Sequence, residues 1–261
     1  MFNCTDIYSV WDKRLIRGIK NYRRQAKQVE YKGNRDEKKN THVFSYEDKT
    51  TELLTKLGVK NMYPGILEAD DVISWLSNKI KHTKVIVSVD QDMLQLVNDT
   101  TFVYSPIKDV IIDKNNFEEK TGVPVDQFLR YKSLMGDKSD NLPGLDKCGP
   151  KTAKKLVTKY PDDVTLEQAL GADKLKPYYT NLDLIDLKQG EVHHPEDCKL
   201  YQEQHAELES HEPDFLGFSN ICESLNMNKI VEKLDDWKTA FSNVNINDRL
   251  ENIVNSLNLT K

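Results

Sequence analysis

Four clusters of acidic residues lie where predicted strands or short loops give way to predicted helices, and their side chains could bind metal ions. The first three clusters each follow a predicted strand, and the carboxyl ends of parallel strands open onto one crevice. Carboxylates gathered there repel one another unless a cation compensates them. Oxygen ligands without His or Cys favour Mg²⁺ or Mn²⁺ over zinc. The clusters are Asp12; Glu68, Asp70 and Asp71; Asp90 and Asp92; and Asp137 and Asp140.

This set of carboxylates is large enough for two ions, which lie roughly 3.5–4 Å apart in sites of this kind. One ion would generate the attacking hydroxide, and the other would stabilise the leaving 3′-oxygen. Each acidic residue has another interpretation, because an Asp after a strand is often only a helix N-cap. For Asp90 taken alone we favour that interpretation. The four clusters together, in register with one fold, favour a two-metal site.

The segment GDKSDNLPGLDKCGPKTAKKLV, residues 136–157, combines glycine-bounded turns with a lysine-rich helix start. Pro143 and Gly144 end one predicted helix, and Gly149 and Pro150 begin the next. A glycine loop before a helix N-terminus exposes backbone N–H groups that bind phosphate. Lysines there attract nucleic acid without reading its bases, although an ordinary corner between two helices is the alternative. The lysine-rich start carries Lys151, Thr152, Lys154 and Lys155.

The hydrophobic pattern predicts an α/β sheet up to about residue 115 and a helical domain after it. The clearest strand is residues 84–89, a continuous apolar run typical of a parallel strand that is buried on both faces. Residues 101–105 and 110–113 are predicted as paired edge strands, and a helix with an apolar stripe begins at Glu68. The other predicted elements are a strand at 7–11, helices at 14–30 and 46–57, a polar linker at 31–40 and an extended segment at 61–67.

The charge is distributed unevenly along the chain. The 261 residues carry a net charge of −5, yet residues 12–39 contain 11 Lys and Arg against 4 Asp and Glu. Residues 181–261 contain 7 basic against 16 acidic residues. A basic arm on an acidic body can bind phosphate at a low overall pI, although a solvated helix face is the alternative.

The N-terminus does not resemble a signal peptide, no stretch is apolar enough to span a membrane, and the four cysteines form no CxxC. We therefore expect a cytoplasmic protein.

Several motifs together resemble the 5′-3′ exonuclease or flap endonuclease family. GDKSDNLPG followed by GPKTA is similar to that family's signature, in which GDxSDN leads into a helix–three-turn–helix. LEADD, VDQDMLQLV and YKGNR are further family motifs and stand in the family's order. The resemblance covers about residues 6–240 and is nearest to stand-alone bacteriophage 5′-nucleases, including the phage ribonuclease H type. It implies a PIN-like α/β nuclease core followed by a helical DNA-binding domain.

The resemblance also implies roles for the carboxylates. Asp12, Glu68, Asp70 and Asp71 would hold the first metal ion, and Asp92, Asp137 and Asp140 would hold the second, with Asp90 close to both. The helical hairpin would clamp duplex DNA and could hold a K⁺ ion on its loop carbonyls.

The basic arm corresponds, in this resemblance, to the helical arch through or under which the 5′ single strand passes. Tyr31, Lys32 and Arg35 fall on it. Lys32, with Arg35 as a second catalytic cation, would neutralise the scissile phosphate as charge develops in the transition state. Tyr31 could stack on an unpaired base, and Arg23 and Arg24 would contact phosphates.

One part of the family pattern has no counterpart. Family members begin with a strand and a metal-binding Asp well before the equivalent of Asp12, which here is only eleven residues from Met1. We therefore expect an N-terminally truncated core. Either an upstream-encoded fragment supplies the missing strand, or the start lies farther upstream, or the chain has lost catalysis and kept binding. The first two are favoured, because the other acidic ligands remain.

The sequence thus predicts a structure-specific, Mg²⁺-dependent 5′-nuclease that removes RNA primers and flaps in phage replication, with branched or nicked DNA and RNA–DNA duplexes as substrates. The alternatives are a catalytically silent junction-binding protein, one half of a split nuclease, and a PIN-like ribonuclease, which would not need the hairpin. The tail could dock on a sliding clamp or single-strand-binding protein, although packing on its own body is favoured. The predicted domains are 1–115 with an arch at about 14–58, 116–242 with the hairpin at 136–158, and a tail at 243–261.

Overall fold

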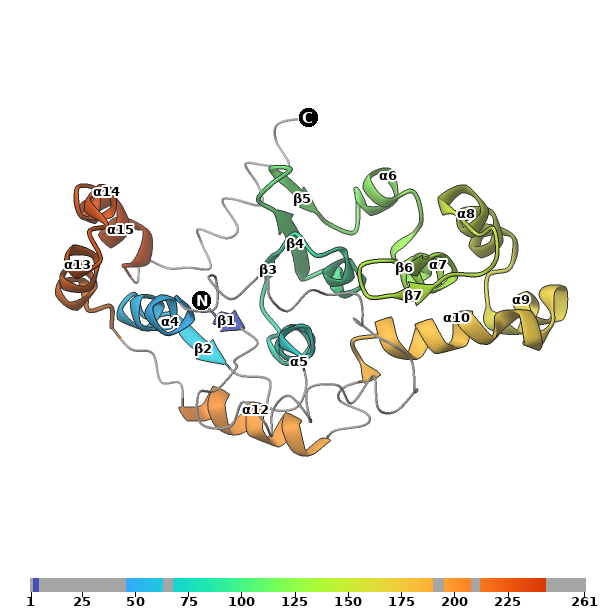
Figure 1. The fold of residues 1–261 in the computed structure, drawn as a ribbon, viewed down its shortest axis with the longest axis horizontal. Helices are drawn as coiled ribbons and strands as arrows, with labels where there is room; N and C mark the ends of the chain where they lie inside the picture. Colours follow the sequence, from blue (N-terminus) through green and yellow to red (C-terminus); the bar gives the residue numbers. More distant parts are fainter. Residues whose placement is uncertain (1, 5–45, 63–67, 190–194, 208–211, 243–261) are drawn as a thin grey trace.

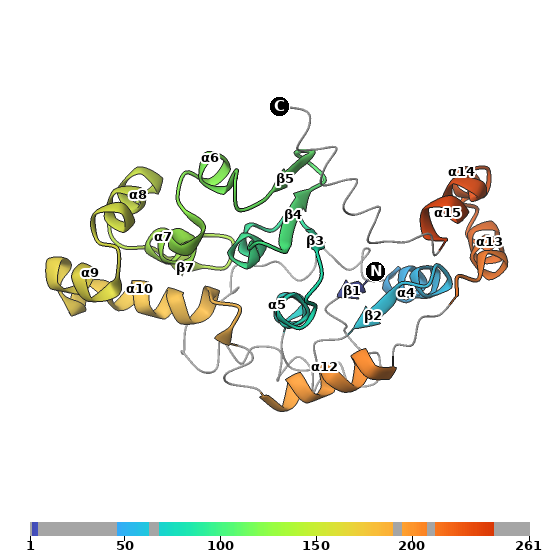
Figure 2. The same cartoon turned by 180° about the vertical axis from the view of Figure 1, so that it is seen from behind.

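The computed structural model describes residues 2–4, 46–62, 68–189, 195–207 and 212–242. Helices α7 to α10 (128–185) gather at one end of the molecule, and helices α4 (47–56) and α13 to α15 (215–241) at the other. Strands β1 to β5 (between 2 and 112) lie between them (Figures 1 and 2). None of the described helices is both long and apolar enough to cross a membrane. The predicted strand at 7–11, helix at 14–30 and linker at 31–40 lie outside the described residues.

Parallel pairing forms the two small sheets of the N-terminal half, as the α/β prediction requires. β1 pairs with β2 in parallel, and β3 pairs with β4 in parallel. β4 also pairs with β5, in antiparallel orientation, so that the second sheet has the order β3–β4–β5. The strands are β1 (Phe2–Cys4), β2 (Lys60–Met62), β3 (Lys84–Val87), β4 (Thr101–Ser105) and β5 (Val110–Ile112).

Two expectations about these strands are wrong. β3 is not buried on both faces, since Val87 is 65% exposed and Val89, just after the strand, is 60% exposed. Among the described residues, β3 is paired along one edge only. Ile86 points to the face opposite Val87 and packs on the apolar cluster that contains Val103 and Leu134. β4 is not an edge strand, because β3 and β5 flank it.

The helix predicted from Glu68 forms as α5 (Ala69–Lys79), and its apolar stripe is buried. Val72, Trp75 and Leu76 pack with Met62 of β2. α12 (Pro195–Glu207) covers this cluster, where the ring of Tyr201 meets that of Trp75 edge-on at 5.8 Å. The 3₁₀ helix η1 (Gln91–Leu96) follows β3.

The helical domain shares one apolar core with the second sheet. Val103 of β4 and Met93 of η1 belong to the same cluster as Leu134, Val157 and Tyr178. Cys148 is buried in it, as expected of a thiol that acts as a small hydrophobe. The elements are α6 (Phe117–Thr121), η2 (Val125–Gln127), α7 (Phe128–Met135), β6 (Gly136–Asp137), β7 (Leu142–Pro143), α8 (Pro150–Lys159), α9 (Asp163–Leu170) and α10 (Ala172–Ile185).

Three C-terminal helices form a group that packs through α13 on α4 (Glu47–Lys56), the helix predicted at 46–57. Phe218 and Cys222 of α13 meet Leu57 and Val59 in a separate apolar cluster. The Lys56 ammonium pairs with the Asp214 carboxylate at 2.7 Å beside it. These helices are α13 (Phe215–Ser224), α14 (Asn228–Val231) and α15 (Leu234–Phe241).

Candidate metal and nucleic-acid site

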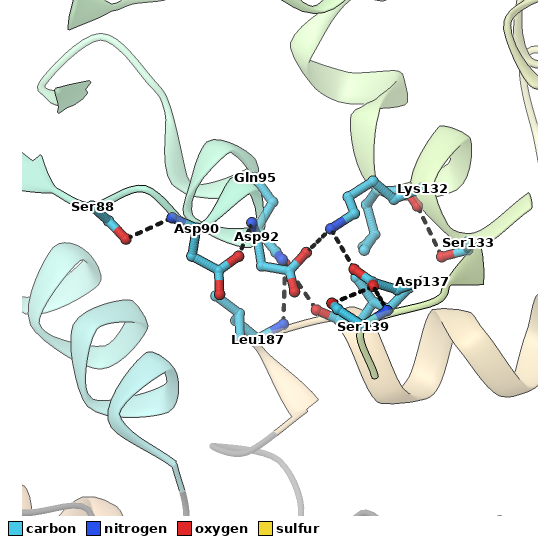
Figure 3. Close-up of polar contacts among 11 residues, drawn as sticks. Ser88, Asp90, Asp92, Gln95, Lys132, Ser133, Asp137, Ser139 and Leu187 are labelled. Carbon is cyan, nitrogen blue, oxygen red and sulfur yellow. Dashed lines mark hydrogen bonds and ion pairs between the residues drawn. The ribbon is translucent and has the colours of Figure 1, made fainter. Parts of the chain in front are cut away.

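The acidic loop after β3 turns Asp92 toward the helical domain. The Asp90 N–H donates to Ser88 Oγ at 3.0 Å, and the Asp92 N–H donates to the Asp90 carboxylate at 2.8 Å. Asp90 therefore caps η1, the role that a lone Asp after a strand often has. Asp90 is exposed, whereas the Asp92 side chain is only 15% exposed and points toward α7 (Figure 3).

Lys132 of α7 lies between Asp92 and Asp137. Its side chain is 7% exposed. The Nζ atom donates to Asp92 Oδ1 and lies 3.4 Å from Asp137 Oδ2 (Figure 3). Two predicted metal ligands, one from the loop after β3 and one from β6, thus converge on a single positive charge.

The loop that carries Asp137 is held by contacts within itself and by a side chain of α10. Asp137 Oδ1 accepts hydrogen bonds from the Ser139 N–H at 2.8 Å and from Ser139 Oγ at 2.5 Å. β6 pairs with β7 and closes the loop. The Asn181 side-chain amide, from α10, donates to the carbonyls of Ser133 at 2.9 Å and Pro143 at 2.8 Å. The Asp137 carboxylate is therefore oriented before any ligand binds.

The charges at this point are strongly coupled. Burial raises the pKa of Asp92, and the neighbouring carboxylates of Asp90 and Asp137 add to the rise, although the Lys132 ammonium opposes it. Burial works against the Lys132 ammonium, but the facing carboxylates outweigh it and raise the Lys132 pKa. For Asp137, burial is outweighed by hydrogen bonds from Ser139 and by the charge of Lys132, which lower its pKa. Lys132 is therefore positively charged, and more than one carboxylate faces its single charge.

The acidic cluster at the start of α5 is engaged in capping the helix. The Glu68 N–H donates to Asp71 Oδ2 at 3.0 Å, and the two side chains form a capping box. Asp71 and Asp140 are buried, and Asp70 is half-buried. Within the described ranges, no three His, Cys, Asp or Glu side chains come close enough together to hold a metal ion. The convergence of all four clusters on one pocket stays a prediction.

Helix α8 presents its lysines on one exposed face. Ala153 and Val157 point into the core, whereas Lys151, Thr152, Lys154 and Lys155 are exposed. A shallow surface hollow of about 600 Å³ is lined by Lys151, Lys154, Lys155, Thr158 and Lys159. The helix begins at Pro150 with Gly149 as its N-cap. Pro150 has no N–H, and the Thr152 and Ala153 N–H groups donate to the Gly149 carbonyl, so the Lys151 N–H is the backbone donor left at the exposed end.

Two glycines of the hairpin, Gly144 and Gly149, differ in their surroundings. A side chain at Gly144 would collide with the backbone of Met135 and Leu134, so this residue lets β7 pack against the end of α7. A side chain at Gly149 would meet nothing within 4 Å. Gly149 is thus the one of the two whose backbone is open to a ligand.

The residues predicted for the arch and one metal ligand lie outside the described residues. They are Asp12, Arg23, Arg24, Tyr31, Lys32 and Arg35. Sequence reasoning also does not single out Lys132. The available signal is its spacing: Phe128, Lys132 and Met135 lie on one face of α7, and a lysine on an apolar stripe just before Asp137 needs a buried anionic partner.

Comparison with known proteins assigns both halves of this arrangement. Residues 2–122 match the family model described as the 5′-3′ exonuclease N-terminal resolvase-like domain, and residues 123–190 match the 5′-3′ exonuclease C-terminal SAM fold. The chain belongs to the 5′-3′ exonuclease family. In this family member Asp92 comes from the first matched domain, and Lys132 and Asp137 come from the second.

Individual relatives agree with this family. A 5′-3′ exonuclease from Buchnera aphidicola is 38% identical over 135 residues, which are 50% of this chain and 46% of that protein. One from Halalkalibacterium halodurans is 34% identical over 189 residues, 69% of this chain and 60% of that protein. The chain therefore spans about half the length of the curated relatives it matches. A bacteriophage T5 flap endonuclease, solved with DNA and metal ions, shares the fold with a TM-score of 0.58 at 22% identity, over 71% of this chain and 78% of that one.

Proposed function

We propose that this chain hydrolyses phosphodiester bonds of nucleic acid near 5′ ends or single-strand/double-strand junctions. The observation that carries this proposal is that Asp92 and Asp137, which come from the two family domains, both face the ammonium of Lys132. The exposed lysine face of α8 supports a role in gripping the backbone of a duplex. The family supplies the class of reaction, and the related flap endonuclease from phage T5 was solved with DNA.

The donor chemistry at Asp92 and Asp137 fits Mg²⁺, with Mn²⁺ as a substitute. Both donors are carboxylate oxygens, and Mg²⁺ is commonly held by one or two carboxylates together with waters and substrate phosphates. Bound divalent ions would activate the attacking water and stabilise the leaving oxygen. In full, Asp92, Asp137 and Asp140 would hold one ion, Asp12, Glu68, Asp70 and Asp71 the other, and Asp90 would lie near both.

The remaining residues would bind and orient the substrate. Lys32 and Arg35 would face the scissile phosphate, where positive charge stabilises the transition state. Tyr31 would stack on an unpaired base, and Arg23 and Arg24 would contact the strand. The hairpin would hold the duplex through the backbone of Gly149 and the α8 lysines, with a K⁺ ion on its loop carbonyls.

The proposed setting is primer and flap removal in phage replication, in the host cytoplasm, on branched or nicked DNA and RNA–DNA duplexes. A fragment encoded upstream could add a strand beside β3, a proposal supported by the second edge of β3, which has no partner strand among the described residues. The tail at 243–261 could bind a sliding clamp or a single-strand-binding protein.

The test is cleavage of a 5′-flap DNA and of a nicked RNA–DNA duplex by the purified chain with Mg²⁺. Asp92→Ala and Asp137→Ala serve as inactive controls, and a parallel sample contains the polypeptide encoded just upstream. Cleavage that both variants lose supports the nuclease. Activity only with the upstream polypeptide establishes a split enzyme. If neither sample cleaves the substrates and the chain still binds the junction, the chain is a catalytically inactive junction-binding protein.

A further inference from the structure

Lys132 is the one lysine or arginine that is buried among the described residues. A buried ammonium is costly unless anions face it. Here Asp92 accepts a hydrogen bond from it, Asp137 lies 3.4 Å away, and the carboxylate of Asp90 also acts on its charge. The side chain reaches this point from α7, which packs on both α8 and α10. The packing of α7 therefore fixes the position from which the Lys132 side chain extends toward the carboxylates.

One ammonium does not balance this environment. Three carboxylates act on a single positive charge. The contact with Asp137 is at the long end of the hydrogen-bonding range, so that carboxylate is only partly compensated by Lys132. A divalent ion carries twice the charge and accepts more oxygen ligands, so it would compensate the same carboxylates better.

A metal ion and the Lys132 ammonium cannot both lie between the two carboxylate oxygens that Lys132 contacts. Nζ is within hydrogen-bonding distance of Asp92 Oδ1 and of Asp137 Oδ2. A cation bound by those two oxygens would occupy the same space and repel the ammonium. Binding of a metal between them therefore requires the side chain of Lys132 to move.

We propose that Lys132 is a positioning residue, an internal counter-ion that holds Asp92 and Asp137 together without metal and competes with the divalent ion for them. This inference rests on the proposed metal site. It goes further in assigning to this chain a residue that sets how tightly the metal binds. Without metal, Lys132 stabilises the fold by keeping the carboxylates from repelling each other. With metal, it makes the apparent affinity lower than the carboxylates alone would allow.

The first experiment measures Mn²⁺ binding by calorimetry at pH 8, without nucleic acid, on the full chain. Lys132→Met removes the charge and keeps most of the side-chain length, and Lys132→Arg keeps the charge. Lys84→Met is the matched control, because Lys84 is also partly buried but donates only to carbonyls and a hydroxyl. We expect Lys132→Met to bind Mn²⁺ about tenfold more tightly. Its Tm should be lower than that of the wild type without metal and should rise more when Mn²⁺ is added.

The second experiment uses the wild-type chain and remains informative if Lys132→Met does not fold. Lysines are acylated with acetic anhydride, with and without Mn²⁺, and Lys132 modification is quantified by mass spectrometry. Displacement by the metal should increase the labelling of Lys132 several-fold relative to Lys84. Labelling of Lys132 that is unchanged or reduced by Mn²⁺ overturns the proposal, as does a folded Lys132→Met that binds Mn²⁺ no more tightly than the wild type.

Asp92→Asn with Asp137→Asn separates this inference from the proposed function. If the wild type binds Mn²⁺ and this double variant does not, the metal site stands, and the Lys132 variants alone decide the inference. If neither the wild type nor Lys132→Met binds Mn²⁺, the proposed metal site fails, and the inference fails with it.

Discussion

The side-chain amide of Gln95 forms two hydrogen bonds with the chain at the end of α10, one of them with the backbone of Leu187. Gln95 Oε1 accepts from the Leu187 N–H at 3.0 Å, and Gln95 Nε2 donates to the Ile185 carbonyl at 3.0 Å (Figure 3). Gln95 lies in η1, three residues after Asp92, whereas Leu187 lies in the second family domain. This contact joins the two family domains that carry the candidate ligands.

Gln95→Ala should destabilise the protein and loosen the site. Loss of the side chain leaves a backbone N–H and a carbonyl without their partner, which costs about 1–3 kcal/mol of unfolding free energy. Urea unfolding in metal-free buffer measures the change. Gln168→Ala, at an exposed position of α9, is the control and should change the free energy by less than about 0.5 kcal/mol. Equal effects of the two substitutions would show that the Gln95 contact contributes nothing particular.

Asn181→Asp should be more damaging than its small change in shape suggests. Asn181 is 1% exposed, and its amide donates to the carbonyls of Ser133 and Pro143. An ionised Asp cannot donate, so the change buries a charge next to two carbonyl oxygens, and we expect a loss of about 3 kcal/mol or more. Urea unfolding at pH 8 measures this loss. Recovery of stability at pH 5 and below, where the introduced carboxyl can protonate, would support the cause, and a wild-type midpoint at pH 8 would contradict it.

Much of the fold could be predicted because local patterns determine it. The apolar stripe of Val72, Trp75 and Leu76 at helical spacing is buried as expected, because a helix with such a stripe has one face to pack. The exposure of Val87 could not be predicted. A continuous apolar run indicates a strand, but its burial depends on whether other strands and helices cover it, which the run itself does not encode.

The candidate site could be predicted only in part, for a similar reason. Asp90 and Asp92 are chemically identical and only two residues apart, yet Asp90 caps η1 and Asp92 faces Lys132. Their difference arises from the direction of the turn, which is a three-dimensional property. Lys132 was missed because lysines are mostly exposed, and only the packing of α7 shows that this one is buried.

Tyr179 provides a test of the electrostatics at high pH. Its hydroxyl donates to the Glu167 carboxylate, and this hydrogen bond, with a contribution from burial, raises the pKa of Tyr179 to about 12. A phenol whose pKa is higher in the folded state adds stability that is fully present below about pH 10 and is lost as the pH rises toward 12. Ultraviolet titration of the wild type minus that of Tyr179→Phe gives the Tyr179 transition, with circular dichroism confirming that the fold persists. Glu167→Gln should lower the midpoint toward 10, and a wild-type midpoint already near 10 would contradict the role of Glu167.

Gly144→Ala and Gly149→Ala should separate folding from nucleic-acid binding within one hairpin. A methyl group at Gly144 would collide with the backbone of Met135, so this variant should lose several kcal/mol of unfolding free energy or fail to fold. At Gly149 the backbone is extended and the space is open, so this variant should keep its Tm within a few degrees. Its methyl group would nevertheless lie where a phosphate approaches the Lys151 N–H at the start of α8, and we expect about tenfold weaker binding to a nicked duplex. Fluorescence anisotropy at fixed salt measures the affinity. Unchanged affinity of a stable Gly149→Ala variant would show that the backbone at the start of α8 does not contact the nucleic acid.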